Sequence, residues 1–392
     1  MKKVGRIAIV YPYGNLDSVP SLCSAATVLA ANGYCVDILT CFDNAYVSPG
    51  FTDERIAVLP VYNRRSERIM ALSFLPGRIY RPLYLLARHL ISHYICVIGV
   101  DPHGLIRARS IAQWLKVPLV YYSLELLLSH ELTTTEERWI KNQERTFSKQ
   151  ATFVIIQDAE RAELLIQDNG LSPDRVFCVP NAPLGRDQRK RSNYLRDKYG
   201  LPSDSRIILH SGAIHAWAGA LQLVQSTQNW PDQWVLVCHT RFRSTFAYTD
   251  VLVALKNLAI PGRVIFSTDP VSQWEYPTMV QSADIGVAFY IPQIGSSYTQ
   301  DNIRHLGLSS GKLAYYLQAG LPVLVNDIPS LQRLVGTYQC GDVITDPSKT
   351  RAAIDRILVH YEQFSQNAVT CFNREFDFAD KFDRVLSALK CL

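Results

Sequence analysis

The sequence predicts an α/β fold with two doubly wound parallel sheets. Short apolar runs bounded by turns alternate with longer segments of helical periodicity, which is the pattern of parallel strands joined by crossover helices. This pattern occurs twice, and a polar segment with several basic residues, 181–205, separates the two series. The length of 392 residues also exceeds what one ordinary core accommodates, which favours two domains.

The first series contains seven predicted strands. After the first of them comes a helix rich in small residues, SVPSLCSAATVLAANGY, which ends at Gly33. The order of strand, helix and strand is that of a Rossmann-like half. The predicted strands span residues 6–12, 35–40, 55–60, 94–100, 118–123, 151–157 and 175–180.

The second series contains five predicted strands, followed by an amphipathic tail, FDFADKFDRVLSALKCL. Phe382, Val385, Leu386 and Leu389 recur in the tail at helical spacing, so we expect a terminal helix that packs at the domain interface. The strands span residues 206–212, 234–240, 263–268, 285–290 and 322–326. The predicted domains are residues 1–183 and 184–375, with the returning helix at 376–392.

Composition and charge limit the class of protein. A net charge of +5 suits contact with anions, but it is too small for the dense basic face of a nucleic-acid-binding protein. No nucleic-acid partner is therefore expected. Nine cysteines without a CxxC spacing argue against a disulfide framework and a structural zinc site. The first apolar run is typical of a strand rather than of a signal peptide, and charged residues interrupt the apolar segment 81–100. These features predict a cytoplasmic protein without a transmembrane segment.

Ligands of open α/β sheets bind at the carboxyl ends of strands, so the loops there hold the candidate residues. In the first half, Asp17 is a sugar contact, a base or simply a helix cap. Asp101 and His103 follow a strand end, where they either face a cleft as functional residues or belong only to the loop that leads into the next helix. Glu125 follows a buried strand and is either functional or paired structurally.

In the second half, Gly212 in LHSGAIHAWAGA would let a phosphate approach the backbone near a helix start. A nucleotide base could contact the backbone near Val271, although an ordinary crossover predicts the same residues.

The stretch GLSSGKLAYYLQAGLPVLVN, residues 307–326, predicts a helix that begins at its serines. Ser309, Ser310 and Gly311 supply hydroxyls and amides at this start, and Lys312 adds a cation where the helix dipole is already positive. That position costs about 0.3 to 1 kcal/mol unless an anion lies in front of it. A bound diphosphate would explain the lysine, and a surface lysine that extends into water is the alternative.

Three longer segments carry further information: FVIIQDAERAELLIQDNGLSPDRVFCVPNAP, ILHSGAI and GKLAYYLQAGLPVLVNDIPSLQRLV. Together they resemble the GT-B glycosyltransferases, in particular the family-4-like (group 1) enzymes. The resemblance implies two Rossmann-like domains that face each other across a cleft, with a nucleotide-sugar donor on the C-terminal domain and a saccharide or lipid-linked acceptor on the N-terminal one. It also implies hexosyl transfer, from a UDP-sugar in our preference, without a metal or other cofactor, in the synthesis of surface polysaccharide or glycolipid.

The sequence departs from the usual family-4 pattern. The two glutamates that flank the donor would fall at Gly307 and Tyr315, and the usual Arg and Lys after HSGAI are also absent. The chain is more similar to a bacterial branch with a KxxxYLxxGxPV signature. This similarity implies that Lys312 and Tyr316 contact the donor phosphates. Assisting residues would be Ser309, Ser310 and either Asn302 or Arg304.

The base for an inverting reaction would be Asp17, Asp101, His103 or Glu125, whereas a retaining reaction needs no protein base. An epimerase of the same architecture and a sugar-nucleotide-binding protein without activity are the alternatives. In residues 62–89, arginines alternate with large apolar side chains. This pattern favours docking on anionic lipid, as in a peripheral membrane protein, and the alternative is an ordinary helix with a solvated basic face.

Overall fold

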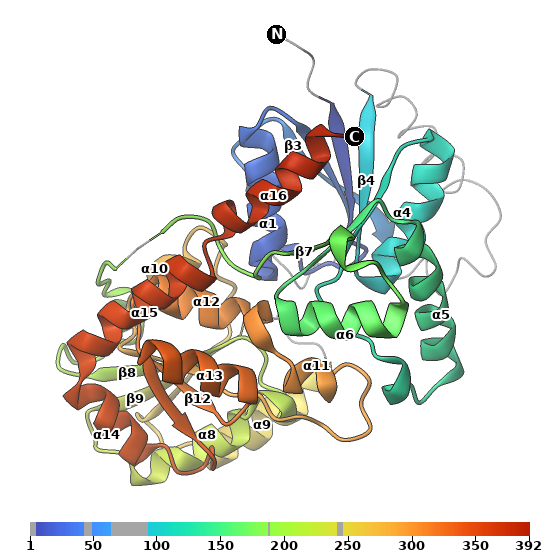
Figure 1. Cartoon of the computed structure of the whole chain (residues 1–392). Helices are drawn as coiled ribbons and strands as arrows, with labels where there is room; N and C mark the ends of the chain where they lie inside the picture. The colour runs from blue at the N-terminus through green and yellow to red at the C-terminus, as the bar shows by residue number, and fades with distance from the viewer. Residues whose placement is uncertain (1–4, 43–48, 64–92, 187–188, 241–245) are drawn as a thin grey trace. The chain divides into compact units, whose positions relative to one another are not determined.

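The computed structural model describes residues 5–42, 49–63, 93–186, 189–240 and 246–392 (Figure 1). Contacts within the chain divide it into two compact units. Unit 1 comprises the described residues up to Pro180 together with Ala379–Leu392, and unit 2 comprises Asn181–Phe378. The polar segment that separates the two predicted series therefore begins unit 2.

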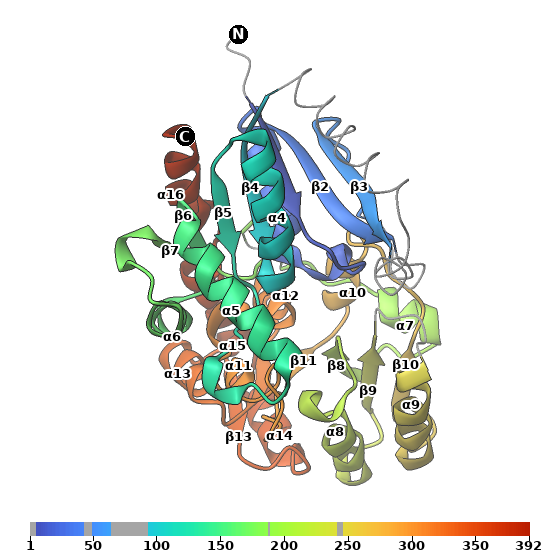
Figure 2. The ribbon, with the colours of Figure 1, turned by 90° about the vertical axis from the view of Figure 1, so that its right-hand side faces the viewer.

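Unit 1 is built on a seven-stranded parallel sheet (Figure 2), with the strand order β3-β2-β1-β4-β5-β6-β7. All seven predicted strands are confirmed, with ends that differ by a few residues. The strands are β1 (Arg6–Val10), β2 (Cys35–Phe42), β3 (Ile56–Asn63), β4 (Tyr94–Val100), β5 (Leu119–Tyr122), β6 (Phe153–Ile156) and β7 (Val176–Cys178).

Local sequence signals begin and end the helices of unit 1. Thr134 and Glu137 form a reciprocal capping box at the start of α5, and Asp158 caps α6, which ends at Gly170 with a φ of 64°. The α-helices are α1 (Pro20–Ala31), α4 (Asp101–Leu115), α5 (Thr135–Gln150), α6 (Ala159–Asn169) and α16 (Phe378–Lys390), and the short 3-10 helices are η1 (Leu16–Ser18), η2 (Ser129–Glu131) and η3 (Pro173–Arg175).

A close approach sets the position of α4 against the sheet. A Cβ atom on Gly104 would lie 2.5 Å from the carbonyl oxygen of Val10 at the end of β1, so only glycine fits there. Leu105 of α4 belongs to the same cluster of buried side chains as Tyr121 and Val154 of the sheet, which is the core of unit 1. The first turn of α4 is thereby held over the carboxyl ends of β1 and β4.

Unit 2 contains a six-stranded parallel sheet with the order β10-β9-β8-β11-β12-β13. The five predicted strands are confirmed, but β13 was missed because GDVI is short, begins with a glycine and an aspartate, and is only partly buried. The strands are β8 (Arg206–Ser211), β9 (Trp234–His239), β10 (Val264–Ser267), β11 (Ile285–Ala288), β12 (Val323–Asn326) and β13 (Gly341–Ile344).

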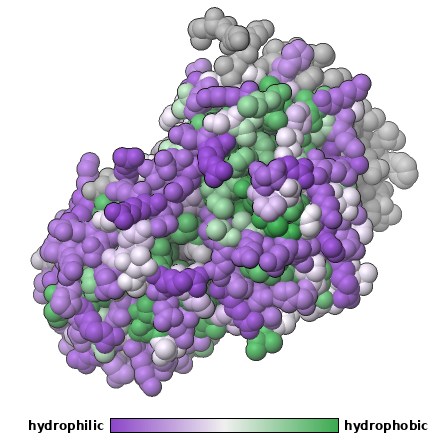
Figure 3. Space-filling view, viewed as in Figure 1, coloured by the Kyte–Doolittle hydropathy of each residue, from purple (hydrophilic) through white to green (hydrophobic). Residues whose placement is uncertain are grey.

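The helices of unit 2 connect these strands and continue beyond β13. The α-helices are α7 (Tyr194–Tyr199), α8 (Ala220–Ser226), α9 (Phe246–Leu258), α10 (Tyr276–Val280), α11 (Asp301–Arg304), α12 (Gly311–Gln318), α13 (Pro329–Tyr338), α14 (Arg351–Val359) and α15 (Tyr361–Glu375). The 3-10 helices are η4 (Ala216–Ala218), η5 (Thr227–Asn229) and η6 (Gly307–Ser309). On the face drawn in Figure 3, mainly hydrophilic side chains cover unit 2, and the hydrophobic patches there are small.

The C-terminal helix returns to unit 1. Its four predicted apolar residues, Phe382, Val385, Leu386 and Leu389, are all buried. The guanidinium of Arg384 lies 5.6 Å from the ring centroid of Phe177 in β7, so the helix lies beside this strand. The apolar face of this terminal helix is therefore buried in unit 1.

The predicted lipid-docking segment, 62–89, lies almost wholly outside the described residues, because the structure describes nothing between Asn63 and His93. Among the helices that are described, none combines the length and apolar character needed to cross a bilayer.

Candidate functional site

The sheet of unit 2 contains a switch point between β8 and β11. The chain leaves β8 toward β9 on one side and leaves β11 toward β12 on the other, and ligands of open α/β sheets bind at the carboxyl ends of two such strands. Gly212 follows β8, Tyr290 follows β11 by two residues, and α12 begins in the connection from β11 to β12. This edge of the sheet is the candidate anion site.

Ser310 caps the start of α12. Its Oγ accepts a hydrogen bond from the backbone N–H of Leu313 at 3.2 Å and is hydrogen-bonded to the hydroxyl of Tyr290 at 2.5 Å. The backbone amides of Gly311 and Lys312 have no hydrogen-bond acceptor among the residues that the structure describes. The helix start predicted at the serines is confirmed, and two of its amides are available to an anion.

Lys312 lies folded against this site instead of extending into water. Its Nζ is 4.4 Å from the ring centroid of Tyr290, and its Cδ is 4.0 Å from the place where a Cβ would stand on Gly212. In the described part of the chain no carboxylate forms an ion pair with Lys312. The side chain keeps some exposed surface, but burial of its ammonium group lowers the pKa of Lys312 to about 7.

His210, the penultimate residue of β8, is fully buried close to Lys312. Its Nε2 lies 3.0 Å from the carbonyl oxygen of Ala213 and must donate there, because a carbonyl only accepts. Burial and the charge of Lys312 lower the pKa of His210 to about 3, so this imidazole is neutral near pH 7. The cationic charge of the site therefore comes from Lys312 and not from its histidine neighbour.

Tyr316 supports the end of β8 from inside the unit. The side chain is fully buried, and its hydroxyl accepts a hydrogen bond from the backbone N–H of Ser211 at 2.9 Å. Its ring occupies the space above Gly286, where a Cβ would lie 2.4 Å from the ring. The expected contact of Tyr316 with the donor phosphates stays a prediction, whereas its contact with Ser211 holds the turn at Gly212 in place.

The other predicted donor residues use their polar groups locally. The hydroxyl of Ser309 donates to Leu306 O at 2.6 Å, and the side-chain amide of Asn302 donates to Tyr298 O at 3.1 Å. Arg304 pairs with Asp301 at 3.1 Å, and Val271 is buried. The structure thus brings together Gly212, Ser310, Gly311 and Lys312, while no hydrogen bond or ion pair joins Val271 or Arg304 to them.

Sequence reasoning missed Tyr290 and Asn326, which join the ends of neighbouring strands. The side chain of Asn326 accepts from the backbone N–H of Tyr290 at 2.8 Å and donates to its carbonyl oxygen at 2.7 Å. Both residues end apolar strand patterns, IGVAFY and PVLVN, and the carboxyl ends of parallel neighbours meet at one edge. Their position at the end of an apolar strand pattern is the feature of the sequence by which both residues could have been predicted.

In unit 1 the corresponding switch point lies between β1 and β4, where Asp101 opens α4. The residue is buried at a φ of 56°, and its Oδ1 accepts from the backbone amides of Leu124 at 2.7 Å and Glu125 at 2.9 Å. Burial, followed by the charge of Glu125, raises the pKa of Asp101 to about 7. Asp101 therefore ties α4 to the loop after β5.

The other three base candidates differ in exposure. Asp17 is buried in η1, Glu125 is exposed, and His103 is partly exposed with its ring 6.2 Å from that of Tyr13. Water and an acceptor hydroxyl can thus reach His103 and Glu125 more readily than Asp17 and Asp101.

The raised pKa of Asp101 predicts a pH dependence of stability. Between about pH 4 and pH 7 the folded state binds more protons than the unfolded state, so the free energy of unfolding should fall as pH rises through this window. Asp101→Asn should flatten this dependence in urea unfolding followed at several pH values. Glu125→Gln, which removes the neighbouring charge, should lower the upper limit of this pH window. An identical pH slope in wild type and Asp101→Asn would contradict the prediction.

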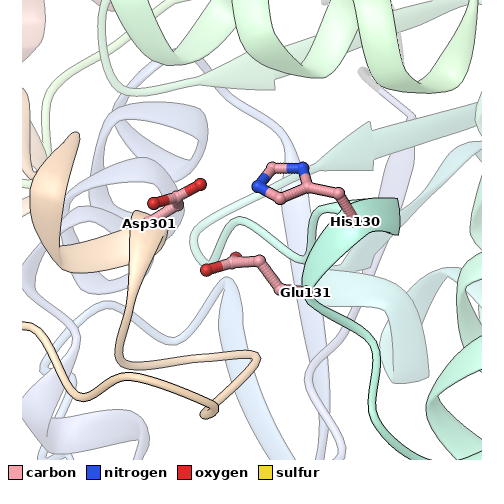
Figure 4. Close-up of side chains that lie close together, drawn as sticks. All are labelled: His130, Glu131 and Asp301. Carbon is pink, nitrogen blue, oxygen red and sulfur yellow. The ribbon is translucent and has the colours of Figure 1, made fainter.

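Neither unit by itself contains a candidate metal site among the residues that the structure describes. Figure 4 shows His130 and Glu131, consecutive residues of η2 in unit 1, and Asp301, the first residue of α11 in unit 2. Among the described residues of either unit taken alone, no three His, Cys, Asp or Glu side chains come close enough to share one ion.

Comparison with protein families and curated proteins yields no match to this sequence. Solved structures do match. The sucrose-phosphate synthase of Thermosynechococcus elongatus has a TM-score of 0.73 at 15% identity, with 99% of each chain covered. HepE of Anabaena, solved in complex with UDP-glucose, has a TM-score of 0.71 at 15% identity, covering 99% of this chain and 100% of HepE.

WaaG, a glycosyltransferase involved in lipopolysaccharide biosynthesis, has a TM-score of 0.65 at 14% identity, with 98% of this chain and 99% of WaaG covered. At such identities the similarity establishes the fold alone. The chain has the fold of the GT-B glycosyltransferases, two Rossmann-like α/β units, as the sequence predicted.

Proposed function

We propose that this protein is a glycosyltransferase whose donor is a nucleoside diphosphate sugar, bound by unit 2 at the start of α12. The observation that carries the proposal is Lys312, a lysine at a helix N-terminus without a carboxylate partner among the described residues, beside two amides without acceptors. A diphosphate supplies the anion that this arrangement lacks. The GT-B fold, and the UDP-glucose bound by the similar HepE, support this choice of ligand.

In this proposal the site acts on the departing diphosphate. As the bond between sugar and phosphate breaks, negative charge develops on the phosphate oxygens, and donors already in position stabilise it without reorganising. Lys312 would supply the positive charge, the amides of Gly311 and Lys312 would donate hydrogen bonds, and Gly212 would let the phosphates approach the backbone after β8. A bound metal is not required for these roles.

The acceptor would be a saccharide or a lipid-linked saccharide held by unit 1. Hexosyl transfer to such an acceptor suits the synthesis of surface polysaccharide or glycolipid on the cytoplasmic face of a membrane, with the protein peripheral to it. If the reaction inverts the anomeric centre, a base must lie near the acceptor hydroxyl, and exposure favours His103 and Glu125 over the buried Asp17 and Asp101. A retaining reaction would need none of them.

A thermal-shift screen tests the donor class. A ligand that binds only the folded state stabilises it by about 2.7 kcal/mol at 100 times its Kd, so UDP and UDP-sugars should raise the Tm. GDP and GDP-sugars serve as the matched comparison, and free sugars as the negative control. No shift with any nucleoside diphosphate or its sugar would contradict the proposed function.

Turnover distinguishes the proposed transferase from the alternatives. Slow release of UDP from a UDP-sugar, with water as a poor acceptor, is the result expected of a transferase. Interconversion of two sugar nucleotides would identify an epimerase, and binding without release or interconversion would identify a non-catalytic protein. Chromatography of the nucleotide products separates all three outcomes.

A further inference from the structure

Tyr290 contacts both parts of the candidate anion site on which the proposed function rests. Its ring lies 4.4 Å from Lys312 Nζ, a distance typical of a cation–π contact, and its hydroxyl is hydrogen-bonded to Ser310 Oγ at 2.5 Å. Ser310 in turn caps α12 through Leu313. One side chain thus reaches the cation and the helix cap together.

Tyr290 is itself held from two sides, by Asn326 at its backbone and by Trp217 at its ring. Asn326, at the end of β12, makes two hydrogen bonds to the Tyr290 backbone, and the ring of Trp217 in η4 lies nearly parallel to that of Tyr290 at 6.3 Å and 19°. Tyr290 is only 7% exposed. A tyrosine held in this way has little freedom to change its rotamer, so it can hold the groups that it contacts.

We propose that Tyr290 is the positioning residue of the anion site: its ring holds Lys312 in place of a carboxylate, and its hydroxyl holds the Ser310 cap. A π face attracts an ammonium group but does not neutralise it, so a diphosphate would still find the full charge of the lysine to pair with. A carboxylate in the position of Tyr290 would instead compete with the diphosphate.

This arrangement has a consequence for protonation. Among the residues that the structure describes, the ionisable side chains near Lys312 are His210 on β8 and Tyr290 after β11, with Tyr315 and Tyr316 on its own helix. Burial lowers the pKa of His210 and raises that of Tyr316, so neither is charged near pH 7. The free lysine, with its pKa lowered to about 7, loses its proton above neutrality. Binding a diphosphate would restore that proton, so affinity should fall as pH rises above 7.

The first experiment needs no ligand. The rate at which acetic anhydride acylates Lys312 Nζ, followed by mass spectrometry across pH, reports where this amine loses its proton. The wild type should titrate near neutrality, and Tyr290→Phe, which keeps the ring, should match it. Tyr290→Met fills similar volume without a π face, so the ring no longer holds Lys312 Nζ in its buried position and the ammonium group can turn toward water. Because burial is what lowers the pKa of Lys312, the midpoint should then move up by at least about 1 pH unit, toward the usual lysine value of about 10.4.

The second experiment measures UDP affinity by calorimetry at pH 7.5 and pH 8.5, where the terminal phosphate has already lost its second proton. Wild-type affinity should fall up to about 10-fold between these values, and that of Tyr290→Met by about 3-fold or less. Tyr290→Phe should keep the wild-type slope but bind about 3-fold more weakly at both pH values, because Ser310 loses its hydroxyl partner.

Tyr361→Met is the matched control, since the ring of Tyr361 lies 5.4 Å from the guanidinium of Arg191 elsewhere in unit 2, and it should change neither readout. A Tyr290→Met variant whose midpoint stays at the wild-type value or falls below it would overturn the proposal, because Lys312 would then keep its buried position without the ring. If that variant does not fold, Tyr290→Phe decides, because a shifted midpoint or unchanged affinity contradicts the proposal. If the wild type binds neither UDP nor GDP, the proposed function fails, while the acylation experiment still tests Tyr290.

Discussion

Lys312→Ala is expected to weaken binding of UDP or GDP about 10- to 100-fold at pH 7 while leaving the fold intact. A hydrogen bond to a charged group contributes about 1.5 to 3 kcal/mol, and each 1.4 kcal/mol is a factor of ten in affinity. The fold should tolerate the change because no carboxylate among the described residues pairs with this lysine, so its removal leaves no unpaired buried anion there. Calorimetry gives the affinity, and circular dichroism checks the fold.

Two variants control this result. Lys312→Arg keeps a positive charge that does not titrate below pH 12, so binding should persist and its dependence on pH between 7.5 and 8.5 should disappear. Lys349→Ala removes an exposed lysine elsewhere in unit 2, with 81% of its side chain accessible, and should leave the affinity unchanged. If Lys312→Ala binds the nucleotide as tightly as the wild type does, Lys312 is not part of the binding site.

Gly286→Val is expected to lower the free energy of unfolding by about 3 kcal/mol, toward the upper end of the usual cost of overpacking a core. Gly286 lies in β11, and a Cβ there would stand 2.4 Å from the ring of Tyr316 near the base of that side chain. The ring cannot move aside cheaply, because Tyr316 is fully buried and bonded to Ser211. The midpoint of urea unfolding measures the loss.

The same variant should also impair nucleotide binding, since displacing Tyr316 releases the backbone of Ser211 beside Gly212. Gly336→Ala is the matched control. Gly336 lies inside α13, and a Cβ added there would meet open space, so the methyl group should be neutral or should stabilise the helix by up to about 1 kcal/mol. Equal urea midpoints for Gly286→Val and the wild type would show that the ring of Tyr316 moves freely.

Much of the fold could be predicted because its signals are local. Strands buried on both faces of a parallel sheet are short apolar runs, and the crossover helices between them carry their own caps, as Ser310 and Asp158 show. The strand β13 lacked such a signal, because an edge strand that is only partly buried does not need an apolar run.

The site was predictable only where one segment supplied its parts. Ser310, Gly311 and Lys312 are consecutive, and a cation in the first turn of a helix is unusual enough to indicate an anion. His210 and Tyr290 could not be found in this way. Both lie near the carboxyl end of an ordinary apolar strand, His210 in β8 and Tyr290 just after β11. What each residue does depends on which strands are neighbours.

The sequence by itself determined the two Rossmann-like series and the lysine at a helix start, because periodicity, caps and dipoles act within a few residues. Only the tertiary structure decided what surrounds that lysine. The parallel pairing of β8 with β11 and of β11 with β12 brings His210, Tyr290 and Asn326 to one edge of the sheet. The lowered pKa of Lys312 arises from burial among groups far apart in the sequence. The tertiary structure also decided what Tyr316 packs against, since its ring fills the space above Gly286.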